Sequence, residues 1–327
     1  MKKIFLFAAA AMVSLSSCVQ TEEVYTGGMQ ELVFKSAVTR GIIQSQVDFN
    51  YPIAVTAVWD DPEDGSDKYK LRFDKAKFVY DNDLRSWRGE TPYYWPNGGN
   101  VDFLGFCPYP NSAVYTSNIN ATTGRIENIV VSSISNNIKD QHDILYSDLL
   151  TVAAPKTDPQ SMTFHHALTQ VNLEFLKSES AAMVVLNSVR LEQVPFVGTL
   201  TITPHDGAES DAEWSGVNVY ENRFFLKGPA ATGIEDFELA ATLTHDTPYS
   251  PMPLLIIPMD HQTSMVITYT VNGHKETKTV DLSAYGAWEM GKKYTYKFNV
   301  NINEILFDCT VYDWDSVDVH GGTQIVI

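Results

Sequence analysis

The sequence predicts an all-β protein with two tandem antiparallel β-sandwich domains, and three observations support this. Short segments alternate between apolar and polar residues, as strands do when they bury one face. Stretches rich in glycine, proline, asparagine and aspartate separate these segments at short intervals. No long segment has the helical spacing of apolar side chains. At 327 residues, of which 44% are hydrophobic, the chain is long enough for two cores.

The clearest predicted strand is 293–302, where tyrosine, phenylalanine, valine and isoleucine alternate with lysine, threonine and asparagine. A hairpin is predicted over 265–282, because Asn272-Gly273 lies between two alternating runs and both turn residues need positive φ. A proline-flanked polar stretch at 154–161 predicts the boundary between the domains. Other strands are predicted at 30–38, 53–59, 77–80, 101–107, 126–132, 144–146, 171–176, 189–193, 199–203, 237–243 and 254–257.

The N-terminus has the order of features found in a bacterial lipoprotein signal. Lys2 and Lys3 precede a short apolar run, which is too short to span a bilayer. Two serines then precede Cys18, as in a lipobox, so we expect 1–17 to be a signal peptide and Cys18 to be acylated. The acidic residues after Cys18 resemble a surface-export signal of Bacteroidetes lipoproteins. The alternative is an ordinary secretory signal that contains a cysteine.

The formal net charge of -17 argues against a nucleic-acid partner, because phosphate binding requires a basic surface. The sequence has no phosphate-binding glycine loop, zinc-protease motif or nucleophile elbow. We therefore expect no enzyme activity, cofactor or metal. Paired carboxylates for glycoside hydrolysis are not singled out among the 40 acidic residues.

Three local features have a structural interpretation. His165 and His166 are adjacent, and neighbouring strand residues point to opposite faces, so they do not favour a shared metal. The acidic stretch 60–67 does not have the EF-hand spacing, and a solvated loop is the alternative to calcium binding. Cys107 and Cys309 are isolated in predicted strands, where free buried thiols are expected rather than a disulfide.

An ordered set of landmarks resembles the fimbrillins, which are subunits of the lipoprotein-derived pili of Bacteroidetes. The resemblance covers most of the chain, and each landmark alone is weak. After the lipobox the landmarks are Leu32-Val33-Phe34, Thr39-Arg40-Gly41, Trp87-Arg88-Gly89, Pro92-Tyr93-Tyr94-Trp95-Pro96, 101–108, 143–147, 164–168 with 171–175, 254–258 and 291–296.

The resemblance implies two transthyretin-like sandwiches, here at 41–158 and 159–327, that follow a lipidated segment at 18–40. It also implies that an arginine-specific protease removes the first strand and that a strand from another subunit fills the exposed groove. Arg40 is the candidate cleavage site, and Leu32, Phe34 and Val38 are the candidate apolar residues of the removed strand. The alternative is a permanent first strand and an uncut Arg40.

At the C-terminus, Ile325, Val326 and Ile327 are the candidate donor strand for a neighbouring subunit. Alternatively they close the chain's own second sandwich, as expected of a tip or accessory subunit. The expected partners are other fimbrillin subunits, the outer membrane through the lipid anchor, and a protein or glycan receptor on a host or bacterial surface. The alternative function is a glycan-binding surface lipoprotein, with Tyr93, Tyr94 and Trp95 as an aromatic platform.

Overall fold

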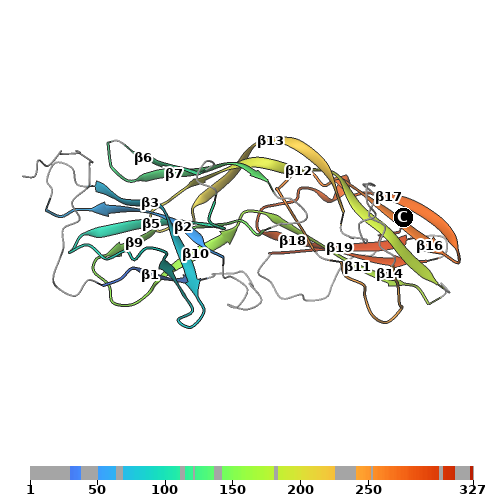
Figure 1. Cartoon of the computed structure of the whole chain (residues 1–327). Coiled ribbons are helices and arrows are strands. Elements are labelled where there is room, and N and C mark those ends of the chain that lie inside the picture. Colours follow the sequence, from blue (N-terminus) through green and yellow to red (C-terminus); the bar gives the residue numbers. More distant parts are fainter. Residues whose placement is uncertain are drawn as a thin grey trace, which may run out of the picture.

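The structure of the protein is a computed structural model. It shows an elongated molecule built from β-sheets (Figure 1). The structure describes residues 30–37, 51–63, 69–110, 115–120, 122–135, 142–179, 183–224, 241–251, 253–301, 305–313 and 325–326. Within these ranges the only helical element is one 3₁₀ turn, η1 (Ser283–Tyr285). No helix in this part of the chain has the length and apolar character needed to cross a membrane.

The first sheet has eight strands and closes on itself. Its order is β2-β3-β4-β1-β10-β8-β5-β9, and β2 also pairs with β5, so the strands from β2 through β1 to β5 form a ring. Its strands are β1 (Val33–Ala37), β2 (Ile53–Asp60), β3 (Tyr69–Asp81), β4 (Ser86–Gly89), β5 (Asn100–Cys107), β8 (Leu145–Ser147), β9 (Leu150–Ala153) and β10 (Gln160–His166).

The other two sheets share the rest of the chain. A seven-stranded sheet contains β6 (Tyr115–Ile119), β7 (Ile126–Ser135), β12 (Val184–Thr203), β13 (Asp211–Phe224), β14 (Ala241–Thr242), β16 (Ser264–Val271) and β17 (His274–Asp281). A five-stranded sheet has the order β15-β11-β18-β19-β20. Its strands are β11 (Thr169–Lys177), β15 (Leu254–Ile256), β18 (Lys292–Val300), β19 (Ile305–Asp313) and β20 (Ile325–Val326).

The long strand β12 runs along both lobes of the molecule (Figure 1). Its first part, Val184–Leu191, pairs with β16, and its last part, from Val197 to Ile202, pairs with β7. The register against β13 shifts three times from Leu191 to Thr199, and Gln193 has a φ of 52° in this stretch. β-Bulges of this kind bend a strand, and the bend lies where β12 leaves one set of partners for the other.

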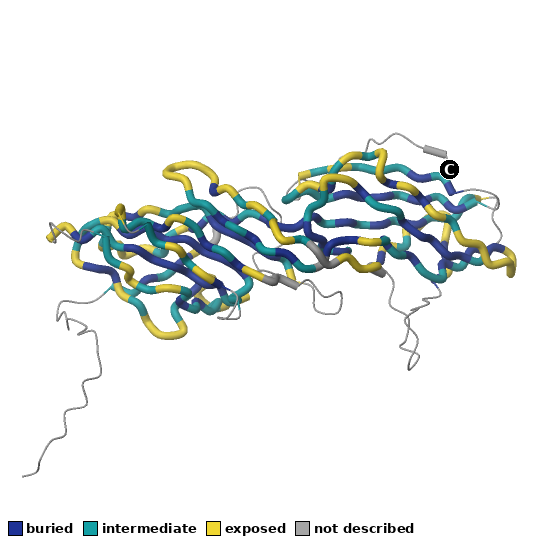
Figure 2. The backbone as a smooth tube through the Cα atoms, turned by 90° about the horizontal axis from the view of Figure 1, so that it is seen from above, coloured by how far each residue is buried: buried dark blue, intermediate teal, exposed yellow. Residues whose placement is uncertain are grey.

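Three apolar clusters fill the space between these sheets. The first lies inside the ring and includes Phe34, Phe78 and Phe103. The second lies between the ring and the layer formed by β6, β7 and the end of β12, and the third lies between the five-stranded sheet and the start of β12 with β16. In both lobes the buried residues line the strand centres and the exposed residues gather at the turns (Figure 2).

The all-β, sandwich-like prediction is confirmed, and several elements follow it closely. β18 (Lys292–Val300) covers most of the predicted strand 293–302 and buries its alternating aromatic residues, and the predicted hairpin forms with φ of 50° at Asn272 and 83° at Gly273. Two predicted strands, 189–193 and 199–203, are parts of the single strand β12. The second cluster takes residues from both sides of the predicted domain boundary.

Candidate functional site: the slot of the first strand

The first strand lies between two strands that are far from it in the sequence. β1 pairs in parallel with β10, with Phe34 opposite Gln160, and antiparallel with β4, with Phe34 opposite Trp87. We call this place between β4 and β10 the β1 slot. β1 is the element that joins β4 to β10, so the ring described above is closed only while β1 occupies its slot.

The apolar side chains of this segment point into the ring. Leu32 is 2% exposed and Phe34 is 0% exposed, whereas Lys35 lies on the exposed face. The Phe34 ring makes edge contacts with Phe78 and Phe103, each at 5.1 Å between centroids. The alternation predicted for this strand is therefore present, and Phe34 is one of the largest fully buried side chains of the described chain.

Polar contacts extend the strand beyond its N-terminal end. The backbone N–H of Leu32 donates to the carbonyl of Tyr93 at 2.8 Å, and that of Trp95 donates to the carbonyl of Gln30 at 3.0 Å. Glu31 accepts hydrogen bonds from the Arg88 guanidinium, through Nε at 3.2 Å and also through a terminal nitrogen. Two nitrogens bound to two carboxylate oxygens is the geometry in which arginine binds a carboxylate most specifically.

Sequence reasoning identified the buried residues of the slot but not its charged pair. Arg88 belongs to the landmark Trp87-Arg88-Gly89, for which the sequence predicts no role, and the sequence gives no role to Glu31. Nothing in the sequence indicates that a β4 residue lies beside β1, because the pairing joins positions 57 residues apart. Charge complementarity between two strands is visible only after the sheet order is known.

The other predicted site residues fall into two groups. Cys18, Val38, Arg40 and Ile327 lie outside the described residues. Ile325 and Val326 form β20, which pairs antiparallel with the chain's own β19, opposite Phe307 and Leu306.

The aromatic segment 93–95 does not present a row of exposed rings. Trp95 is 8% exposed and meets the Phe103 ring edge-on at 5.7 Å. Tyr93 is stacked on Phe78 at 5.7 Å between centroids. Tyr94 alone is exposed, so this segment is mainly core and edge packing, the more common role of aromatic residues in sandwiches.

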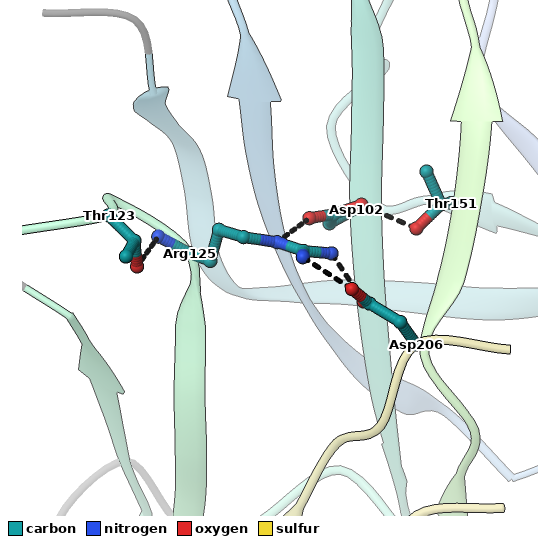
Figure 3. A network of polar contacts seen from close by, with 5 residues as sticks. All are labelled: Asp102, Thr123, Arg125, Thr151 and Asp206. Carbon is teal, nitrogen blue, oxygen red and sulfur yellow. Dashed lines mark hydrogen bonds and ion pairs between the residues drawn. The ribbon is translucent and has the colours of Figure 1, made fainter. Parts of the chain in front are cut away.

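A second polar cluster joins the ring to the β12–β13 turn (Figure 3). Arg125 donates to Asp206 in that turn at 2.6 and 2.5 Å and to Asp102 of β5 at 3.2 Å. Thr151 donates to the other oxygen of Asp102 at 2.6 Å. Asp102, Arg125 and Asp206 line part of a pocket of about 220 Å³, but the guanidinium is already neutralised by the two carboxylates. The cluster therefore acts as a joint between layers and does not offer a free charge to a ligand.

Hydrogen bonding to Arg125 lowers the pKa of Asp206. The same partner, Asp206, is the main cause of the raised pKa of Arg125. Both shifts result from the pairing and favour the charged form of each partner.

The histidine pair behaves as two separate residues. His165 lies 2.9 Å from the Asp148 carboxylate, which also accepts the backbone N–H of Ser210 at 2.9 Å. His166 is buried and lies 2.6 Å from Asp143. The two imidazoles thus have different carboxylate partners, and the His165 group makes a second link between the ring and the β12–β13 turn.

The remaining candidates for chemistry have structural roles among the described residues. Cys107 and Cys309 are free thiols, and burial raises the pKa of Cys309 to about 12. Asp61, from the acidic stretch, is paired with Lys70 at 2.7 Å. The described part of the chain contains no group of three or more residues suited to hold a metal ion.

Comparison with known proteins gives one family. A family model described as fimbrillin-like matches residues 39–314. A fimbrial protein from Bacteroides vulgatus is similar in structure, with a TM-score of 0.57 and 14% identity, over 87% of this chain and 99% of that chain. A search of curated proteins found no match.

Two proteins described as putative cell adhesion proteins are also similar in structure. The one from Bacteroides uniformis has a TM-score of 0.54 and 15% identity, over 89% of this chain and 99% of that one. The one from Bacteroides ovatus has a TM-score of 0.54 and 14% identity, over 89% of this chain and 100% of that one. At these identities the likeness concerns the fold.

Proposed function

We propose, from the premise that this chain belongs to the fimbrillin-like family, that it is a cell-surface fimbrial subunit acting in adhesion. In this proposal it is exported as an outer-membrane lipoprotein through Cys18 and cut after Arg40. The cut releases the segment 18–40, and a strand of another subunit enters the β1 slot. The two sandwiches at 41–158 and 159–327, of the transthyretin-like type, form the body of the subunit.

The observation that carries the proposal is the position of β1. It is the first strand of the described residues, it is paired on both sides, and it carries the buried Phe34 into the ring. After a cut at Arg40, β1 is held to the remainder of the chain by its strand pairing and side-chain packing and no longer by the backbone that leads to β2.

The energetics favour exchange over a permanently empty slot. Burial of Leu32 and Phe34 contributes on the order of 1.5–3 kcal/mol each before entropy is subtracted. Loss of β1 also leaves the facing edges of β4 and β10 unpaired, which is a template for another strand. An incoming strand completes the sheet, and so restores both the buried apolar contacts and the backbone hydrogen bonds with β4 and β10.

A native digestion tests the proposal. The full chain is treated with an arginine-specific protease under native conditions, and the products are identified by mass. We expect cleavage after Arg40, a stable remainder beginning at Gly41, and no such product from Arg40→Gln. Arg85→Gln is the matched control, because Arg85 is an exposed turn arginine whose loss leaves the Arg40 cut unchanged. A chain that resists cutting, or is degraded throughout, contradicts this route of assembly.

The C-terminal strand supports a place at the end of a fibre. β20 pairs with β19 of the same chain and is therefore engaged within its own second sandwich. A subunit within a shaft donates a strand to its neighbour, whereas a tip or accessory subunit does not need to. Deletion of 325–327 tests this, because it should lower the stability of the isolated chain if β20 serves its own sheet.

A further inference from the structure

We propose that Arg88 makes the β1 slot selective for a strand of a different subunit that carries a carboxylate three residues before a buried aromatic or aliphatic side chain. The preferred pattern is acid–apolar–any–apolar, as in Glu31-Leu32-Val33-Phe34. This inference rests on the proposed strand exchange and adds the chemistry that distinguishes one incoming strand from another.

The position of Arg88 allows it to pair with the carboxylate only when the strand in the β1 slot has the native register. Arg88 lies on β4 directly opposite Val33, and its guanidinium reaches past that residue to the Glu31 carboxylate. The side chains are only partly exposed, 38% for Arg88 and 23% for Glu31. A slip of one residue turns every side chain of a strand to the other face, so only the native register places both the carboxylate on Arg88 and the apolar side chains in the ring.

The Arg88 guanidinium also disfavours strands that lack an acid at the Glu31 position. Glu31 is the carboxylate with which Arg88 pairs among the described residues, so departure of β1 takes away the partner of this guanidinium. A strand with an apolar residue at the Glu31 position leaves the half-buried charge unpaired, and a strand with a basic residue repels it. Specificity often depends on such unfavourable pairings as much as on the favourable one.

The chain's own C-terminus matches the apolar part of the pattern but not the acidic part. Gln324-Ile325-Val326-Ile327 has the same alternation as the first strand, with a neutral amide where Glu31 has a carboxylate. An amide forms weaker hydrogen bonds with a guanidinium than a carboxylate does. The C-terminal strand of a second copy of this chain is therefore a poorer occupant of the slot than a donor strand with an acid at that position, and the slot favours a donor strand from a different subunit.

The experiment measures how fast the cut N-terminal fragment leaves and which peptides replace it. The full chain is cut after Arg40, and loss of the fragment is followed by size-exclusion chromatography with mass detection. We expect the fragment that carries Glu31→Gln to dissociate roughly 5- to 10-fold faster than the unchanged fragment. Lys35→Gln is the matched control, because Lys35 lies on the exposed face of the same strand and its charge change should have no comparable effect.

Peptides then test the occupant directly on the cut protein. A peptide of residues 29–38 should bind roughly 5- to 10-fold more tightly than its Glu31→Gln form. A peptide of 320–327 should bind more tightly when Gln324 is replaced by glutamate. Arg88→Met should abolish both differences in affinity. Arg88→Lys keeps the positive charge but cannot bind the carboxylate through two nitrogens, so it should retain part of each difference.

The outcomes separate this inference from the proposed function. If the peptides bind equally whatever stands at the Glu31 position, the selectivity is refuted while strand exchange stands. If no peptide binds and the fragment never leaves, both are refuted. The peptide comparison uses one unchanged protein, so it remains decisive even if an Arg88 variant does not fold.

Discussion

Replacement of Phe34 by alanine should be among the most damaging single changes in the first strand. The side chain is 0% exposed and fills the ring between β4 and β10. Truncation removes its buried apolar surface and leaves a cavity, because the surrounding sheet is closed and has little freedom to collapse.

The magnitude follows from the contacts. Burial of a phenylalanine contributes about 2–3 kcal/mol. Each of its two edge-on contacts, with Phe78 and with Phe103, adds about 0.5–1.5 kcal/mol. The sum agrees with the loss of about 3–5 kcal/mol typical of phenylalanine-to-alanine changes in cores.

Urea unfolding followed by tryptophan fluorescence measures this effect, because Trp87 and Trp95 lie in the same apolar cluster as Phe34. Phe34→Leu should give an intermediate loss and keeps the test usable if the alanine variant does not fold. Val33→Ala is the control: Val33 is on the opposite face and partly exposed, so the loss should stay below about 1 kcal/mol.

A loss below about 1 kcal/mol for Phe34→Ala would refute the reasoning. It would mean that β1 does not form part of the folded ring and that the slot closes without it. Equal losses for Val33→Ala and Phe34→Ala would refute the assignment of faces, because alternation predicts a large difference between neighbours.

Three other perturbations test other parts of the fold. Gly99→Ala should cost roughly 3 kcal/mol or more, because its φ is 75° and an added Cβ would lie 2.1 Å from a backbone oxygen. At Gly98 an added Cβ would lie 3.8 Å from its nearest neighbour, a Pro62 side-chain atom, so Gly98→Ala should cost only about 1–2 kcal/mol. Equal urea midpoints for the Gly98 and Gly99 variants would contradict this. The pKa of Asp206 is lowered by Arg125, so its stabilising effect should be present above about pH 4 and lost as the pH falls through the folded-state value. Asp206→Asn should therefore lower the free energy of unfolding at pH 6, by less than about 1 kcal/mol for this exposed pair, and this loss should shrink as the pH falls below about 4. Cys309 has a pKa raised to about 12, so iodoacetamide at pH 8 should modify it slowly in the native protein and quickly in urea; equal rates would contradict its burial.

The sequence was most informative where a strand buries one face and ends in a defined turn. β18 and the hairpin of β16 and β17 follow directly from alternation and from Asn272-Gly273. β13 was not predicted, because its residues 211–224 are largely polar and interrupted by glycine. It lies at the side of β12, where one strand supplies the pairing and much of its surface stays exposed.

The arrangement of the strands was beyond the reach of local patterns. The pairing of β1 with β10 brings together residues about 126 positions apart, and it is parallel in an otherwise mainly antiparallel sheet. The continuous β12 appeared as two strands because the bulged stretch at Gln193 breaks the alternation. Alternation identifies which side chains are buried, but it does not specify the strand on the other side of each hydrogen bond.

The continuity of β12 has a mechanical consequence. Its two parts are inserted into separate hydrogen-bonded ladders, with β16 at one end and β7 at the other. A pull along the long axis is therefore carried from lobe to lobe along the continuous backbone of β12. Each ladder resists that pull by shearing many hydrogen bonds together, whereas unzipping would load them one at a time. The stretch of β12 around Gln193, where the register against β13 is irregular, is the part of this backbone that lies between the two ladders.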